Sequence, residues 1–325
     1  MYKRLDMDCK TMNKPFVSVI IPNYCHARYL DERLTSVLNQ TYPHFEIIIL
    51  DDCSPDNGAS KAVIEKYRKN PHVSHIVYNE VNSGSPFKQW HKGFDLAKGD
   101  YIWIAESDDS CDCHFLEVLT KIMTDNSQCT LALCRSVTID SEGYKTGVHY
   151  TQKEKDKAIN MDGRLFISKE MQYANLVCNA SSALFRKDVL SEIKQDYTDY
   201  KACGDWLFWI YIMEHGNVSY TPLMLNYYRM HDTNTTEKCI ANGISDHELF
   251  LITNYLYDQG YISKRNLMRV KAAHYDFRKF RHPFDNKNTV LLSEKEWGYS
   301  SLTWLIVKYD HLLDKIIKMM KRLII

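Results

Sequence analysis

The first half of the chain alternates short apolar runs with longer stretches in which apolar residues recur at helical spacing. The apolar runs predict four strands, at residues 17–21, 45–50, 75–78 and 101–105, and the last of these is expected to be buried on both faces. The stretches between them predict amphipathic helices, at residues 29–40, 59–69 and 87–97. Strands and helices that follow one another in this way are typical of βαβ units. We therefore expect an α/β fold with a mostly parallel central sheet flanked by helices.

The second half of the chain has a more mixed pattern. It predicts two helices, at residues 113–126 and 206–215, and extended segments at residues 131–139, 181–185 and 218–228. From about residue 237 onward only helical patterns occur. We therefore expect three parts, namely a leader at residues 1–15, a main domain at residues 16–235 and a helical C-terminal extension at residues 236–325.

Acidic residues stand where two of the predicted strands end. The second and fourth strands run directly into Asp51, Asp52, Glu106, Asp108 and Asp109. Neighbouring carboxylates repel one another, so such a group is costly beside a hydrophobic sheet unless a cation or hydrogen-bond donors compensate. Right-handed crossovers align the carboxyl ends of parallel strands along one rim. We therefore expect Tyr24, Asp52 and Asp109 to face a common crevice that binds a divalent metal.

Composition narrows the class of protein. The 325 residues are 45% hydrophobic, enough for a large core, and 41 basic residues balance 41 acidic ones. This balance gives no overall field that would attract nucleic acid. The ten cysteines are dispersed without a C-x-x-C pair, which favours reduced thiols over disulfides or structural zinc. Neither a signal peptide nor an apolar run of membrane-spanning length is found, so we expect a cytoplasmic protein.

The common nucleotide-binding and hydrolase motifs are absent from the sequence. It contains no G-x-G-x-x-G, G-x-x-x-x-G-K-[ST], H-E-x-x-H or G-x-S-x-G. An α/β sheet with acidic strand ends and no phosphate loop would hold a nucleoside diphosphate through a metal, because Mg²⁺ and Mn²⁺ bind carboxylate and phosphate oxygens together.

Two long segments carry a resemblance to a known family. They are VSVIIPNYCHARYLDERLTSVLNQTYPHFEIIILDDCSPD, near the N-terminus, and NSGSPFKQWHKGFDLAKGDYIWIAESDD, which leads into the acidic cluster. With later matches, roughly residues 16–235 resemble the family 2 glycosyltransferases of the GT-A fold. The resemblance implies a catalytic domain over this range and leaves the last part of the chain outside it.

The resemblance implies a metal and diphosphate site. Asp109 is then the main ligand of Mn²⁺ or Mg²⁺, and Asp108 contacts the donor ribose and the metal. The alternative for Asp108 is a cap of the following helix. The late segment LNYYRMHDTNTT implies His231 as a further metal ligand and Arg229 as a phosphate contact, although a lone histidine is usually a surface residue. Glu106 departs from the simplest form of the motif, and its role is open.

The resemblance also implies a site for a uracil-type base. Asp52 falls where the family recognises the base, because a carboxylate can accept the imide proton, and Tyr24, following Pro22, falls where a ring stacks on it. For the neighbouring Asp51 we expect a turn with Ser54 instead.

Two further residues complete the implied site. Asp205 begins a strongly apolar helical segment and falls where the family places its catalytic base; a plain helix N-cap is the alternative. Lys88 is a weaker candidate for a diphosphate contact, because a lysine on a helix is more often only solvated.

The resulting expectation is an inverting, metal-dependent glycosyltransferase. It would move a sugar from a nucleoside diphosphate donor, UDP-linked by resemblance, to a hydroxyl of a glycan or lipid-linked acceptor in surface polysaccharide synthesis. The alternatives are a sugar-nucleotide nucleotidyltransferase, although PNYCHARYL lacks the required glycines, and a non-catalytic module that binds nucleotide sugars.

The end of the chain leaves a possible membrane contact open. Residues 303–325 predict a helix with apolar residues on one face and basic residues largely elsewhere. Such a helix either lies on the inner face of a membrane or packs on the catalytic domain.

Overall fold

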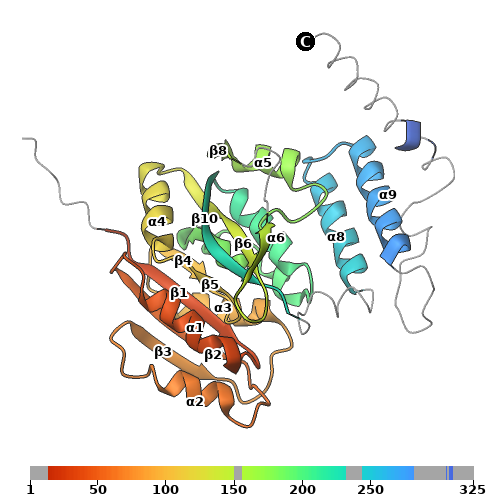
Figure 1. Cartoon of the computed structure of the whole chain (residues 1–325). Helices are drawn as coiled ribbons and strands as arrows, with labels where there is room; N and C mark the ends of the chain where they lie inside the picture. Colours follow the sequence, from red (N-terminus) through yellow and green to blue (C-terminus); the bar gives the residue numbers. More distant parts are fainter. Residues whose placement is uncertain (1–13, 150–155, 232–243, 282–304, 306, 310–325) are drawn as a thin grey trace, which may run out of the picture.

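The structure is a computed structural model that describes residues 14–149, 156–231, 244–281, 305 and 307–309. Within these residues a ten-stranded sheet forms the centre of the molecule (Figure 1). Its strand order is β3-β2-β1-β4-β9-β6-β10-β5, with β7 paired to β6 and β8 paired to β10.

The N-terminal half of the sheet is parallel. Its strands are β1 (Val17–Asn23), β2 (Phe45–Asp51), β3 (Val73–Tyr78) and β4 (Tyr101–Ile104). The helices that connect them are α1 (Ala27–Leu38), α2 (Ala59–Glu65) and α3 (Pro86–Leu96). The strands and helices predicted from the apolar pattern are confirmed here. The crossovers bury both faces of β1, β2 and β4, whereas the edge strand β3 is only partly buried.

The C-terminal half of the sheet is mixed. Its strands are β5 (Ser110–Cys111), β6 (Cys129–Ile139), β7 (Lys145–His149), β8 (Ile159–Asp162), β9 (Ala183–Arg186) and β10 (Asn217–Arg229). The accompanying helices are α4 (Phe115–Asp125), α5 (Gly163–Glu170) and α6 (Gly204–Met213), with short 3₁₀ turns η1 (Ala180–Ser182), η2 (Asp188–Ser191) and η3 (Asp196–Asp199).

One strand near the middle of the sheet runs against both of its neighbours. Strand β9 runs antiparallel to both β4 and β6, whereas β10 is parallel to β6. The strands β3, β2, β1, β4, β6 and β10 consequently share one direction, in agreement with the predicted mostly parallel sheet. The short elements β5, β7, β8 and α5 were not predicted, because they carry too few apolar positions for a periodic pattern.

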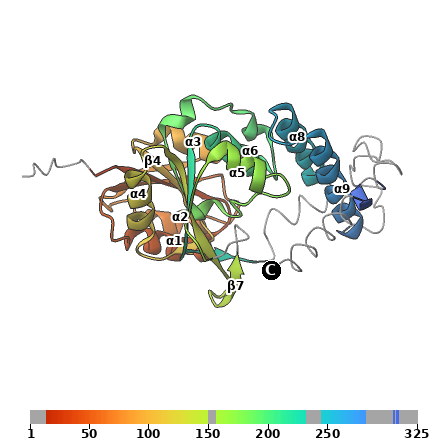
Figure 2. The same ribbon diagram turned by 90° about the horizontal axis from the view of Figure 1, so that it is seen from above.

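Helices cover both faces of the sheet (Figure 2). Their apolar side chains form two cores, one on each face. Val19, Trp103 and the apolar side chains of α1, α2 and α4 fill one core. Ile20, Ile102 and the apolar side chains of α3, α5 and α6 fill the other. Successive residues of a strand point to opposite faces, so one buried strand supplies both cores. Burying each large apolar side chain contributes about 1.5–3 kcal/mol.

The C-terminal extension is helical where the structure describes it, as predicted. Helices α8 (Ile244–Asp258) and α9 (Lys264–Arg281) lie side by side next to α6 (Figure 1). Ile252 and Leu256 of α8 belong to the same apolar core as α6, so the extension shares the core of the main domain. The domain boundary proposed at residue 235 stays a prediction, because a shared core does not mark where one domain ends.

Two predictions concern the membrane and the ends of the chain, which the described residues cover only in part. No helix among those residues is long and apolar enough to cross a membrane. The leader at residues 1–15 and the amphipathic stripe of residues 303–325 lie almost entirely outside them.

Candidate active site

Two neighbouring cavities open where the parallel strands end. The larger has a volume of about 500 Å³ and the smaller about 210 Å³. His26, Pro86 and Glu106 line both cavities, so the two adjoin, and together they are called the crevice below. The predicted crevice at the strand ends is therefore present, at the position where open α/β sheets bind their ligands.

Asp52 lies in the wall of the larger cavity and is 5% exposed. Its Oδ1 accepts hydrogen bonds from Asn79 Nδ2 (2.7 Å), the backbone N–H of Ser83 (2.9 Å) and Gln89 Nε2 (2.9 Å). Its Oδ2 accepts one bond, from Ser83 Oγ (2.7 Å). A carboxylate oxygen has two lone pairs, so Oδ2 keeps an acceptor position for a ligand N–H.

Pro22 and Tyr24 line the same cavity, as the expected base site requires. Tyr24 is 46% exposed, which leaves its ring available for stacking. Asp51 has a different role. Its carboxylate accepts bonds from Ser54 Oγ (2.7 Å) and Asn23 Nδ2 (2.7 Å), which confirms the turn predicted for this residue.

Lys88 is not brought to the site. It is exposed on α3 and lines neither cavity, whereas the next residue, Gln89, faces the larger one. The sequence placed a basic residue near the crevice, but the helical rotation of about 100° per residue turns the neighbouring position inward.

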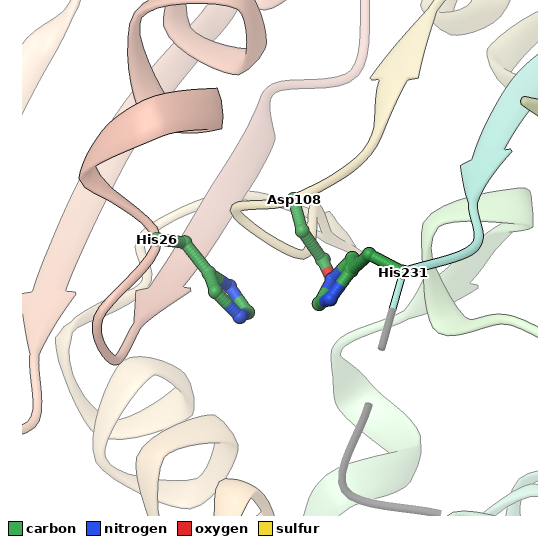
Figure 3. A group of neighbouring side chains, drawn as sticks. All are labelled: His26, Asp108 and His231. Atoms are coloured by element: carbon green, nitrogen blue, oxygen red, sulfur yellow. The ribbon is translucent and has the colours of Figure 1, made fainter. Parts of the chain in front are cut away.

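The smaller cavity contains a cluster of possible metal ligands (Figure 3). His26, Asp108 and His231 each offer one ligand atom, and these atoms all lie within 4.8 Å of one another. Asp108 Oδ2 lies 3.0 Å from His231 Nε2, and His26 Nδ1 lies 2.9 Å from Ser107 Oγ. The three side chains come from the loops after β1 and β4 and from the end of β10, as Figure 3 shows.

His26 was missed by the sequence reasoning. It follows β1 in the same loop as Tyr24, so the rule that strand ends share one rim applies to it as well. That position, three residues beyond a buried strand, is the one signal that could have identified it.

The protonation of this cluster suits a divalent cation. Burial lowers the pKa of the His26 imidazole, which favours its neutral, ligating form. Burial alone would raise the pKa of Asp108, but the hydrogen bond from His231 and the two neighbouring imidazoles outweigh it and lower that pKa. A carboxylate with two imidazoles is a mixed oxygen and nitrogen donor set, which fits Mn²⁺ better than Mg²⁺.

Asp109 was expected to be the principal metal ligand, but its side chain lies outside both cavities. It is 1% exposed and lines neither cavity. Its Oδ2 accepts bonds from Ser181 Oγ (2.7 Å) and Asn179 Nδ2 (2.9 Å), and its Oδ1 accepts from the backbone N–H of Arg229 (2.9 Å). Interior donors compensate this charge, so the crevice receives Asp108 instead.

Arg229 also differs from its expected role as a phosphate contact. Its side chain is 1% exposed and stays inside the protein. Nη2 pairs with Glu32 Oε2 (2.6 Å), Nη1 donates to the Asp140 carbonyl (3.0 Å), and Nε donates to the Asp108 carbonyl (2.7 Å). Arg229 consequently holds the backbone that carries Asp108 rather than facing the crevice.

Glu106 stands between the two cavities. Its Oε1 accepts a hydrogen bond from Trp90 Nε1 (2.9 Å). Burial, reinforced by the charge of Asp108, raises the pKa of Glu106 to about 8. At neutral pH this environment favours the protonated form of the side chain whose role the sequence left open.

Asp205 lies in the first turn of α6 and lines the smaller cavity together with Asp108. The N-cap of α6 is Cys203, so Asp205 is not the cap. Asp205 Oδ2 accepts a bond from Asn175 Nδ2 (2.8 Å), which orients the carboxylate. Burial raises the pKa of Asp205 to about 6.

The fold and the crevice define an α/β enzyme whose acidic groups meet at the carboxyl ends of a mostly parallel sheet. The model of the family "Glycosyl transferase family 2" matches residues 18–194, more than half of the chain. The chain belongs to this family and is a glycosyltransferase, which decides against the two alternatives considered from the sequence. Asp205 and His231 lie beyond the matched residues.

Named relatives extend this assignment. The poly(ribitol-phosphate) beta-N-acetylglucosaminyltransferase TarP of Staphylococcus aureus is 27% identical over 282 residues, which cover 85% of this chain and 79% of TarP. The putative teichuronic acid biosynthesis glycosyltransferase TuaG of Bacillus subtilis is 38% identical over 114 residues. That match covers 35% of this chain and only 44% of TuaG.

Solved structures share the fold. The crystal structure of S. aureus TarS 1-349 in complex with UDP-GlcNAc has a TM-score of 0.62 and 20% identity, and the match covers 87% of this chain and 78% of that one. The mannosyltransferase PcManGT from Pyrobaculum calidifontis, in complex with GDP-Man and Mn²⁺, has a TM-score of 0.56 and 15% identity, over 84% and 73% of the two chains.

Proposed function

We propose that this glycosyltransferase transfers a sugar, with inversion, from a UDP-linked donor to a hydroxyl group of a surface glycan. One observation carries the proposal: Asp205, oriented by Asn175, lines the same cavity of about 210 Å³ as Asp108 and His231. A base and a diphosphate-binding cluster within one small cavity are what a single displacement at the anomeric carbon requires.

Asp205 is the proposed catalytic base. Its carboxylate takes the proton of the acceptor hydroxyl while that oxygen forms a bond to the anomeric carbon. The bond from this carbon to the donor diphosphate breaks, and its electron pair leaves with the diphosphate. A pKa of about 6 keeps Asp205 ionised at neutral pH and still basic enough to accept the proton.

Asp108 and His231, with His26 as a third ligand, are the proposed holders of the divalent metal. When bound, the metal would neutralise the negative charge of the diphosphate. This proposal moves the principal ligand from Asp109 to Asp108, because the carboxylate of Asp109 is enclosed by interior donors. The Mn²⁺ complex of the mannosyltransferase neighbour supports a divalent metal as cofactor.

The larger cavity is the proposed base site. Asp52 Oδ2 offers an acceptor for the imide N–H of uracil, and Tyr24 offers a ring face beside Pro22. The UDP-GlcNAc complex of the TarS neighbour supports a uridine nucleotide. The names of the relatives TarP and TuaG support a cell-wall polymer as the acceptor. A cytoplasmic location, with residues 303–325 at the inner face of the membrane, fits such an acceptor.

A thermal-shift panel tests the donor class. UDP, GDP, CDP and their sugars are added with Mn²⁺ or with EDTA, and a selective rise in melting temperature with UDP compounds and Mn²⁺ is expected, because ligands that bind only the folded state stabilise it. Asp205→Asn is expected to keep this shift and to lose turnover of UDP-sugar. Retained turnover would remove Asp205 as the base, and a stronger response to GDP would reassign the donor.

A further inference from the structure

Glu248 of α8 links the helical extension to a segment that borders the active site. Its carboxylate is 6% exposed and accepts hydrogen bonds from three consecutive backbone N–H groups. Oε1 accepts from Lys201 (2.7 Å), and Oε2 accepts from Ala202 (2.9 Å) and Cys203 (2.7 Å). A buried carboxylate that collects three backbone donors fixes the conformation of the segment that supplies them.

This segment leads directly into the proposed base. Lys201 and Ala202 line the smaller cavity, Cys203 is the N-cap of α6, and Asp205 follows in the first helical turn. The N–H groups at the start of a helix have no partner within the helix, and the helix dipole favours a negative charge there. Of the three donors, only the N–H of the N-cap residue Cys203 belongs to the start of α6, and Glu248 accepts it from another helix because the side chain of Cys203 makes no capping bond.

Residues of the main domain also contact this segment. Ser85 Oγ donates a hydrogen bond to the Tyr200 carbonyl (3.2 Å), and Ser85 lines the larger cavity. At Gly204 a Cβ atom would lie 2.5 Å from the Tyr197 carbonyl oxygen, so the chain has no room to move toward η3. Residues 200–204 are thus held by contacts to Ser85, Tyr197 and Glu248, of which Glu248 contributes a carboxylate.

We propose that Glu248 is a positioning residue for Asp205: it fixes residues 201–203 so that the carboxylate of Asp205 points into the smaller cavity. The inference rests on the proposed role of Asp205 as the base. It assigns to the helical extension a part in turnover, although the extension lies outside the residues matched by the family model.

A second contact of the extension provides a matched control. At the opposite end of α6, Glu214 Oε1 accepts hydrogen bonds from Tyr255 (2.8 Å) and Tyr261 (3.0 Å). A rise of roughly 1.5 Å per residue puts Glu214 about 14 Å along the helix from Asp205. This contact also attaches the extension to α6 but touches no residue of the crevice.

The experiment compares three variants of the full chain. Glu248→Gln keeps the size of the side chain but turns an amide NH₂ toward backbone donors; Glu248→Asp keeps the charge with a shorter reach. Tyr255→Phe combined with Tyr261→Phe removes the distant contact. Melting curves fix a temperature at which all variants are folded. At this temperature the kcat for turnover of UDP-sugar is measured, together with the Kd of UDP in the presence of Mn²⁺.

For Glu248→Gln we expect kcat to fall at least about tenfold, because a displacement of about 1 Å in a reacting group can cost about a hundredfold. The Kd for UDP of Glu248→Gln is expected to stay unchanged. The kcat of Glu248→Asp should lie between those of Glu248→Gln and the wild type, and the double tyrosine variant should keep the wild-type kcat.

Wild-type kcat in Glu248→Gln would overturn the inference, as would an equal loss in the tyrosine control. If Glu248→Gln does not fold, wild-type kcat in Glu248→Asp has the same consequence. Turnover retained in Asp205→Asn would instead remove the proposed function, so the two failures are distinguishable.

Discussion

Asp108 Oδ2 and His231 Nε2 lie 3.0 Å apart although 123 residues separate them in the chain. Asp108 follows β4 and His231 follows β10, and the strands β9 and β6 lie between these two in the sheet. The contact therefore joins the ends of the parallel and the mixed halves of the sheet. Both residues line the smaller cavity together with Asp205.

His231→Ala is expected to weaken metal-dependent nucleotide binding. Removing one of the three proposed ligands leaves Asp108 and His26, and even changes outside a ligand shell cost about 10–100-fold in metal affinity. The Mn²⁺ concentration that half-saturates the UDP-induced thermal shift should rise at least about tenfold. An unchanged Mn²⁺ titration, with the variant folded, would remove His231 from the metal site.

Asp109→Ala is expected to act mainly on stability. The change leaves the interior donors of Ser181 and Asn179 without their acceptor and removes the charge that faces Arg33 at 3.7 Å. Breaking a buried charged contact of this kind costs about 3–5 kcal/mol, measurable by urea unfolding. A variant of wild-type stability that no longer responds to Mn²⁺ would restore Asp109 as the principal ligand.

The pKa of Asp205 predicts the acidic limb of the pH profile. As the proposed base, Asp205 must be ionised, and burial raises its pKa to about 6, so turnover should fall as pH decreases through about 6. Below that value kcat should drop about tenfold per pH unit. The measurement uses saturating donor and Mn²⁺, and the Kd of UDP at each pH separates this limb from protonation of the metal ligands.

Glu106→Gln is expected to change how stability depends on pH. Burial raises the pKa of Glu106 from its ordinary value of 4.5 to about 8, so the folded state binds its proton more tightly than the unfolded state does. The free energy of unfolding of the wild type therefore falls as pH rises from about 4.5 to about 8. A glutamine side chain does not titrate in this range, and it retains an oxygen that can accept the hydrogen bond from Trp90 Nε1.

In buffer containing EDTA, the stability of Glu106→Gln relative to the wild type should consequently increase between pH 5 and pH 8. Titrating groups that do not interact with Glu106 are common to both proteins and cancel in the difference, so the remaining pH dependence comes from Glu106 and its neighbours Asp108 and Asp109. A difference that does not vary with pH would show that Glu106 is ionised throughout this range.

Much of the fold could be predicted because its signals are local. The apolar runs that became β1, β2 and β4 are buried on both faces, and the helices between them have one apolar face each. The positions of Asp52 and Tyr24 beside one cavity follow from the same rule, since parallel strands must end on one rim. The short strands β5, β7 and β8 depend on partners far away in the chain and left no such signal.

The sequence by itself determined the layered α/β fold, the acidic rim and the helix that begins beside Asp205, because periodicity and composition are properties of neighbouring residues. Only the tertiary structure decided which of two adjacent acids faces the crevice. Asp109 turns inward because Ser181 and Asn179 supply donors there, and Asp108 is left to meet His231. Long-range contacts of this kind, like that of Glu248 with residues 201–203, arise from packing between distant segments, on which local patterns carry no information.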